Sequence, residues 1–163
     1  GMRVLPPFEG GSGEGFARGN TDALYRQREL IREFEPDLVL VLSADHLYTL
    51  NFLDVLETHR SCHADLTMVT TEIDEDASRY GVVQVDGDGR VVDFDYKPDN
   101  PNGRLVAAEI FLFDARALLD ALDALADEQE ELADYGDDLV PWFLAHRTVV
   151  EHRLRGYWMD LGT

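Results

Sequence analysis

The stretch Leu38-Val39-Leu40-Val41-Leu42-Ser43-Ala44-Asp45-His46 decides how the rest of the chain is interpreted. Its first five residues form an unbroken apolar run, which is typical of a β-strand buried on both faces. Asp45 follows directly after that strand. Ligands of open α/β sheets bind beyond the carboxyl ends of the strands, so the Asp45 carboxylate is expected to face a binding crevice. From position alone, an aspartate that caps the next helix is an equally good interpretation.

Patterns on both sides of this strand predict alternating helices and strands. A helix is expected from Asn20 to Pro36, with Asn20 or Thr21 as its cap. Its apolar face is formed by Ala23, Leu24, Leu30, Ile31 and Phe34. A second helix over 51–62, capped by Asn51, and a strand over 65–71 follow. Strand, helix and strand at this spacing predict a βαβ unit with a parallel pair of strands.

The middle of the chain has a β pattern. Two β-prone runs, 80–85 and 90–96, are separated by Asp86-Gly87-Asp88-Gly89, which predicts a hairpin. The remaining expected elements are a strand over 105–113, a helix from its cap Asp114 to about Glu131, a helix over 137–146 and a strand over 148–154. The predicted fold class is therefore α/β, with a mixed sheet flanked by helices.

The first 19 residues are expected to form an irregular segment before a single domain over 20–163. Pro6 and Pro7 disfavour a helix, and the run Gly10-Gly11-Ser12-Gly13-Glu14-Gly15 is typical of a flexible linker. A phosphate-binding loop is the less favoured alternative, because no Lys-Ser/Thr ending and no preceding apolar strand accompany the glycines.

The net charge and the cysteine content limit the kinds of partner and the cellular compartment that are expected for this chain. The chain has 163 residues and a formal net charge of −19, from 33 acidic and 14 basic side chains. Nucleic acids and anionic membrane surfaces are bound by clustered Lys and Arg, so this charge argues against both. No apolar run approaches the roughly 18 residues needed to cross a bilayer. Anionic substrates would need a cation, for which a divalent metal is the obvious choice. Cys62 is the only cysteine, which favours a reducing cytoplasm.

Asp160 and Lys97 are further candidates for a site that handles phosphate. Two aspartates from distant strands, Asp45 and Asp160, can hold one Mg²⁺ between them. Lys97 ends the second strand of the predicted hairpin, where it could neutralise a phosphate. From position alone, a solvated lysine before a turn is the favoured interpretation of Lys97.

A zinc site is a weaker candidate. His59 and His63 lie four residues apart beside Cys62 on a predicted helix, a spacing that zinc ligands use. No second ligand group accompanies them, so exposed residues at the end of a helix are the favoured interpretation.

Six short blocks then occur in order between residues 19 and 163. They are Gly19-Asn20-Thr21-Asp22-Ala23-Leu24, Leu42-Ser43-Ala44-Asp45-His46-Leu47-Tyr48, Tyr80-Gly81-Val82-Val83, Gly89-Arg90-Val91-Val92 running to Lys97-Pro98, Asp134-Tyr135-Gly136 with 138–141, and Gly156-Tyr157-Trp158-Met159-Asp160-Leu161-Gly162-Thr163. Together these blocks resemble the glucose-1-phosphate adenylyltransferase family, also called ADP-glucose pyrophosphorylase. Each block alone is a modest signal, and six in the family's order are a strong one.

The resemblance implies a Rossmann-like, GT-A-like nucleotidyltransferase domain. Its reaction would convert ATP and glucose 1-phosphate to ADP-glucose and pyrophosphate, for glycogen biosynthesis in the cytoplasm. By the same resemblance Asp45 and Asp160 would hold Mg²⁺ and Lys97 would bind the sugar phosphate, with Gly81 and Glu109 in the same part of the site. The nucleotide would face the turn formed by Gly19, Asn20, Thr21, Asp22 and Ala23.

The chain departs from the family's pattern in several places. The family's N-terminal glycine-rich loop, with its arginine and lysine, has no counterpart before residue 19, and the C-terminal β-helix is also missing. The chain alone is therefore expected to be inactive or nearly so. Tyr96 replaces the family's acidic residue before the lysine, Ala107-Ala108-Glu109 replaces Ser-Met-Gly, and Met159 replaces an arginine. Glu109 adds bulk and charge where a glucose ring would lie, so another sugar phosphate is an alternative substrate.

Two further expectations concern function and assembly. A noncatalytic relative that binds sugar nucleotides or protein partners is the alternative to an enzyme. Missing strands would leave apolar edges of the sheet exposed, which predicts that the chain forms a homo-oligomer.

Overall fold

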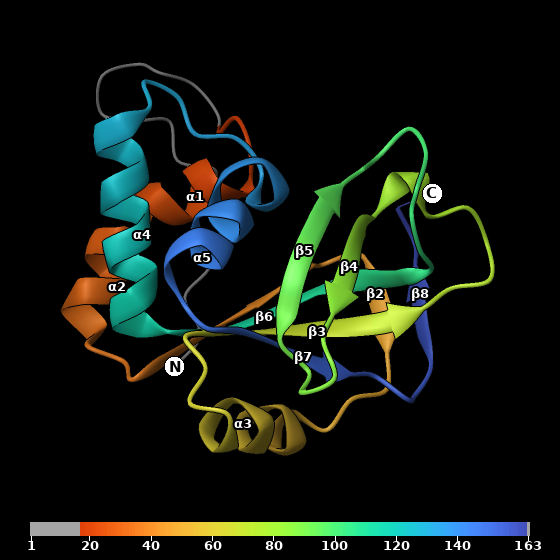
Figure 1. The fold of residues 1–163 in the computed structure, drawn as a ribbon. Coiled ribbons are helices and arrows are strands. Elements are labelled where there is room, and N and C mark those ends of the chain that lie inside the picture. Colours follow the sequence, from red (N-terminus) through yellow and green to blue (C-terminus); the bar gives the residue numbers. More distant parts are fainter. Residues whose placement is uncertain (1–16, 163) are drawn as a thin grey trace.

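The computed structural model describes residues 17–162 of the chain and has a mixed sheet with helices on both faces (Figure 1). The main sheet has the order β5-β4-β6-β3-β7, with β1 paired to β6 as well, and a second sheet consists of β2 and β8. The strands are β1 (Leu38–Leu42), β2 (His46–Tyr48), β3 (Leu66–Glu72), β4 (Gly81–Val85), β5 (Val91–Tyr96), β6 (Leu105–Asp114), β7 (Val149–Arg153) and β8 (Trp158–Asp160). The predicted α/β fold class with a mixed sheet is thus confirmed.

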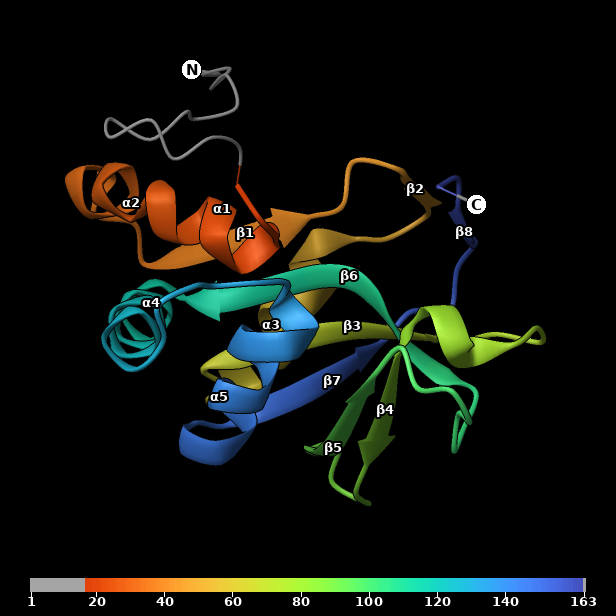
Figure 2. The ribbon, with the colours of Figure 1, turned by 90° about the horizontal axis from the view of Figure 1, so that it is seen from above.

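Helices form the two outer layers. They are α1 (Asn20–Arg26), α2 (Arg28–Phe34), α3 (Phe52–Ser61), α4 (Ala115–Glu128) and α5 (Val140–His146), with a short 3₁₀ turn η1 (Ala77–Arg79) and a π-helical turn η2 (Tyr135–Leu139). Helix α3 lies on one face of the sheet and the other helices lie on the opposite face (Figures 1 and 2). The β2–β8 pair lies at the end of the molecule farthest from α2 and α4.

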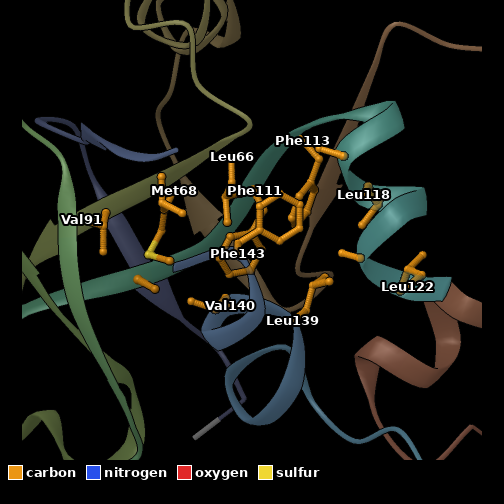
Figure 3. Packing of buried hydrophobic residues seen from close by; sticks show 14 of the residues in the cluster. Leu66, Met68, Val91, Phe111, Phe113, Leu118, Leu122, Leu139, Val140 and Phe143 are labelled. Atoms are coloured by element: carbon orange, nitrogen blue, oxygen red, sulfur yellow. The ribbon is translucent and has the colours of Figure 1, made fainter. Parts of the chain in front are cut away.

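The side-chain alternation of β3 and β6 builds one core on each face of the sheet. Phe111 and Phe113 of β6 point toward α4 and α5, where they pack with Leu118 and Phe143 (Figure 3). The intervening residues of β6, including Ile110, pack on the α3 side. Both faces of these central strands are apolar because each face is covered by helices.

Several local predictions are confirmed, together with the hydrogen bonds or turns on which they were based. The Asn51 side chain accepts a hydrogen bond from the Leu53 backbone N–H at 3.1 Å, as a helix cap does. Asp114 caps α4 in the same way, through the Ala117 N–H at 2.8 Å, although the helix ends at Glu128 rather than near residue 131. The hairpin of β4 and β5 forms around the predicted turn.

The prediction that residues 38–42 are buried on both faces is wrong. Leu40 and Leu42 of β1 are 39% and 42% exposed. Strand β1 pairs only with β6 among the described residues, so its other edge has no strand beside it. The predicted parallel pair is also wrong in its adjacency. Strands β1 and β3 run in the same direction, but β6 lies between them and is antiparallel to both.

The helix predicted from Asn20 to Pro36 is two helices that meet at Gln27. Neither Asn20 nor Thr21 caps the first helix, because the N-cap residue is Gly19. Phe34 is exposed.

The prediction of exposed histidines is wrong for His59, which is buried with its Nδ1 2.9 Å from Thr67 Oγ1. Among residues 17–162, no helix combines the length and apolarity needed to span a membrane.

Candidate active site

The pairing of β2 with β8 brings Asp45 and Asp160 together. In this small antiparallel sheet His46 lies opposite Asp160, and the Leu161 N–H donates a hydrogen bond to the Asp45 carbonyl oxygen at 2.9 Å. One potential ligand atom from each of Asp45, His46 and Asp160 lies within 4.8 Å of the other two. Two carboxylates that are far apart in the sequence thus share one location, together with an imidazole.

Hydrogen bonds hold both carboxylates in place. The Ser43 hydroxyl donates to Asp45, and this bond, together with the Asp45 backbone N–H, lowers the pKa of the Asp45 carboxyl group. Asp160 Oδ1 accepts the Gly162 N–H at 2.7 Å. A Cβ atom at Gly162 would lie 2.7 Å from Asp45 Oδ2 and 3.2 Å from Asp160 Oδ1. A glycine at 162 therefore leaves room for the two carboxylates to approach one another.

The His46 side chain faces both carboxylates and is almost fully buried, with only 5% of its surface exposed. Its Nδ1 lies 3.0 Å from the Ala108 carbonyl oxygen, which can only accept, so Nδ1 carries a hydrogen. Nε2 then points at the carboxylates, 3.8 Å from Asp45 Oδ1 and 3.7 Å from Asp160 Oδ1. In the neutral ring this places a lone pair toward two anions, an arrangement that a divalent cation between the three groups would satisfy.

An irregularity in β6 supports this cluster. The register of β6 against β3 shifts between Ala107 and Phe111, and Glu109 within that interval has a left-handed φ of 52°. The Glu109 carbonyl oxygen accepts the Ser43 N–H at 3.1 Å, while the Ala108 carbonyl oxygen holds His46. One irregular stretch of strand therefore positions both Ser43 and His46, and bulges of this kind are frequent next to active sites.

Lys97, the only lysine of the chain, lies beside the same stretch. Its Nζ lies 4.5 Å from the centroid of the Tyr96 ring. The interaction with Tyr96 raises the pKa of Lys97, and the carboxylates of Asp134 and Glu109 raise it further, against a lowering by partial burial. Burial, followed by the charges of Glu109 and Asp134, raises the pKa of Tyr135 to about 12. Glu109 is thus within electrostatic reach of Lys97 and Tyr135, and the Lys97 amine stays protonated.

The predicted nucleotide turn packs against residues 133–134. The Thr21 N–H donates to the Ala133 carbonyl oxygen at 3.0 Å, and a Cβ atom at Gly19 would clash with the Ala133 backbone. Thr21 and Asp22 are buried, whereas Asn20 is exposed and Ala23 is half-buried. Partial burial would raise the pKa of Asp22, but hydrogen bonds from the Arg26 side chain and the Arg18 N–H lower it overall.

Gly81 lies at the start of β4, opposite Tyr96. A Cβ atom at Gly81 would clash with the Phe94 ring, so a glycine there allows Phe94 to pack over the backbone.

The sequence did not identify three residues that the structure places at the site, namely His46, Asp134 and Trp158. The Trp158 ring packs edge-on against His46, with 5.1 Å between the ring centroids. The signal for His46 was its position next to Asp45. Asp134 and Trp158 belonged to recognised blocks without an assigned role.

Comparison with known proteins identifies the family of the chain. Residues 9–163 match the nucleotidyl transferase family. Among curated relatives, the glucose-1-phosphate adenylyltransferases of Thermomicrobium roseum, Lachnospira eligens and Clostridium acetobutylicum are 37%, 34% and 34% identical to this chain, and each comparison covers 100% of the chain. The chain spans about two fifths of these relatives' own length, 38% for the first two and 43% for the third. The match covers nearly the whole chain, and the chain therefore belongs to the nucleotidyl transferase family.

Proposed function

We propose that this chain is part of a sugar-1-phosphate nucleotidyltransferase that forms ADP-glucose and pyrophosphate from ATP and glucose 1-phosphate. The observation that carries the proposal is the meeting of Asp45, His46 and Asp160 at the β2–β8 sheet. The similar proteins are glucose-1-phosphate adenylyltransferases, which supports the choice of substrates. The lone cysteine supports a cytoplasmic setting, and glycogen biosynthesis is the process that the family resemblance implies.

In this proposal Asp45 and Asp160 hold Mg²⁺, which prefers oxygen ligands, and His46 faces the same point. When bound there, the cation would neutralise charge on the phosphate oxygens of the substrates. The Ser43 hydroxyl keeps Asp45 ionised, and the Gly162 N–H fixes the orientation of Asp160. The Asp45 carboxylate is therefore ready for a cation without first losing a proton at neutral pH.

Lys97 has the role of holding the sugar phosphate. Its protonated amine offers a point charge for the phosphate group, and its left-handed backbone, with φ of 49°, is fixed by a hydrogen bond from its N–H to the Tyr80 carbonyl oxygen at 3.0 Å. One phosphate oxygen of the sugar phosphate bonds to the α-phosphorus of ATP. The bond from that phosphorus to the bridging oxygen breaks, and pyrophosphate leaves with the electron pair. Positioning and charge neutralisation are sufficient for such a step.

The nucleotide has its proposed place at the turn from Gly19 to Ala23. Asn20 is exposed at this turn, while the turn itself is held by the hydrogen bonds to residues 133–134. On the sugar side Glu109 contributes a negative charge near Lys97. If the sugar ring lies against this strand, the bulk and charge of Glu109 restrict which sugar phosphates fit.

The test is Mg²⁺-dependent release of pyrophosphate from ATP and glucose 1-phosphate by the complete product of the gene. Asp45→Asn should abolish release, because it removes one charge from the cation site. Asp88→Asn, in the exposed turn between β4 and β5, is the matched control and should leave release unchanged. A folded protein that releases no pyrophosphate from any of several nucleotides and sugar phosphates would instead indicate a binding protein without catalytic activity.

A further inference from the structure

Residues 133–136 lie between two parts of the proposed site, the nucleotide turn and the strand end that carries Lys97. On the first side, the Thr21 N–H donates to the Ala133 carbonyl oxygen, and the Asn20 N–H donates to Asp134 Oδ1 at 3.0 Å. The close approach of Gly19 to the backbone of Ala133 and Asp134 leaves no space for a side chain at position 19. The turn is therefore held directly against Asp134.

On the second side, the same carboxylate contacts Tyr96. The Tyr96 hydroxyl donates to Asp134 Oδ2 at 3.2 Å. The ring is fixed from two directions, because it stacks with Phe94 at 6.3 Å and lies so close to Gly136 that a Cβ atom there would clash with it. Burial raises the pKa of the Tyr96 hydroxyl, so the group remains a neutral donor. Each oxygen of Asp134 thus has one partner, and the two partners belong to the two halves of the site.

Tyr96 is also the direct neighbour of the proposed phosphate ligand. The Lys97 amine lies 4.5 Å from the centroid of the Tyr96 ring, and the interaction with Tyr96 is the largest cause of the raised pKa of Lys97. A phosphate bound by Lys97 would compete for the amine and draw it away from the ring. Phe94 and Gly136 hold the ring, so the hydrogen bond from its hydroxyl to Asp134 is the connection from Tyr96 to the nucleotide turn.

We infer that Tyr96 is a positioning residue that couples the binding of a sugar phosphate at Lys97 to the nucleotide turn, through Asp134 and the Asn20 N–H. The inference rests on the proposed function, because it assigns the two ligands to the two sides of Asp134. Coupling of this kind is reciprocal: each ligand must change the affinity for the other by the same factor. Tyr96 occupies the position where the resembled family has an acidic residue, so this hydroxyl-to-carboxylate bond is a feature of this chain's own sequence.

The experiment measures the affinity for α,β-methylene-ATP, which cannot transfer its nucleotidyl group, with and without saturating glucose 1-phosphate and with Mg²⁺ present. Titration calorimetry of the complete gene product gives the dissociation constants, and the amide resonance of Asn20 reports on the turn. The wild-type protein should bind the nucleotide analogue about fivefold or more tightly when the sugar phosphate is present. The Asn20 resonance should shift when glucose 1-phosphate alone is added.

Tyr96→Phe removes only the hydroxyl and should bring the ratio of the two dissociation constants close to one, with the Asn20 resonance no longer responding. Asp134→Asn should act in the same direction, because an amide offers only one acceptor oxygen for two donors. Tyr25→Phe, which removes a hydroxyl from α1 without touching Asp134, is the matched control and should retain the wild-type ratio.

The outcomes separate the inference from the proposed function. If both ligands bind, two results would overturn the inference alone. One is a ratio of the two dissociation constants in Tyr96→Phe equal to that of the wild type. The other is the absence of coupling in the wild type. Failure of the wild-type protein to bind either ligand would overturn the proposed function and the inference with it.

Discussion

The Leu161 N–H donates a hydrogen bond to the Asp45 carbonyl oxygen, and this bond joins the residue after β8 to the residue before β2. The bond continues the pairing of β2 with β8, and these two strands form a sheet separate from the main one. The position of the candidate cation site therefore depends on three residue pairs of a small separate sheet. Its geometry should be sensitive to small changes in the backbone beside Asp160.

Gly162→Ala tests this sensitivity. The new Cβ atom would lie 2.7 Å from Asp45 Oδ2, and the exposed carboxylate can move away, so the fold should be retained while the cation site is distorted. We expect apparent Mg²⁺ affinity to fall by about tenfold or more, as changes to groups that support metal ligands do. Calorimetric titration with Mg²⁺ measures this. Gly87→Ala, where a Cβ atom would meet nothing within 4 Å, should leave the affinity unchanged; equal affinities for both variants would contradict the prediction.

Glu109→Gly should affect both stability and substrate use. A left-handed φ of 52° suits glycine, so the change should stabilise the fold by roughly 1 kcal/mol. Removal of the carboxylate near Lys97 should also lower the KM for glucose 1-phosphate, if a glucose ring lies against this strand. Urea unfolding and steady-state kinetics measure the two effects. Glu109→Gln removes the charge but keeps the backbone strain, so it should change only the KM; an unchanged or higher KM in the glycine variant would exclude the proposed location of the sugar.

Buried His59 should make the free energy of unfolding depend on pH. Burial lowers the pKa of the His59 ring, against smaller opposing effects of Asp114 and Asp65, so the unfolded chain binds this proton more readily than the folded one. The contribution is complete above the ordinary histidine pKa of about 6.5 and is lost as the pH falls below it. The urea midpoint should fall more between about pH 7.5 and pH 5.5 in the wild type than in His59→Gln. His63→Asn, at an exposed position, is the control, and identical pH profiles for the wild type and His59→Gln would refute the prediction.

The free edge of β1 should promote self-association. Leu40 and Leu42 are exposed on a strand that has no second neighbour among the described residues, and such edges pair readily with other strands. We expect dimers or larger species by light scattering at low micromolar concentration. Leu40→Lys should shift the population toward monomer, while Val92→Lys, at an exposed position on the edge strand β5, should not. A monomeric wild-type protein would rule this assembly out.

Local signals were sufficient for most elements of the fold. Asn51 and Asp114 act as caps because their side chains bond to backbone groups two or three residues away, which a sequence reveals directly. The position of β1 could not be inferred in this way. Its apolar run predicts a strand, but the exposure of Leu40 depends on which strands lie beside it, a property of long-range pairing.

In the candidate site, too, the sequence predicts what depends on local position but not what depends on long-range contacts. Asp45 was accessible to sequence reasoning through its place after a strand, and the family resemblance supplied the pairing with Asp160. Strands β2 and β8 have three residues each, too short for a periodic pattern, so the contact of His46 with both carboxylates was not visible. The two contacts of Asp134 come from segments far apart in sequence, and no spacing rule connects them.

The single lysine of the chain has a practical consequence for chemical labelling. Among residues 1–163, Lys97 is the only residue whose side chain carries a primary amine for reagents that modify amines. The raised pKa of Lys97 keeps its amine protonated and therefore slow to react at neutral pH, so modification should accelerate in alkaline solution. Mass spectrometry after such labelling would report the accessibility of one defined atom, Nζ of Lys97, and protection by a phosphorylated compound would identify that compound as a ligand of this position without any assay of turnover.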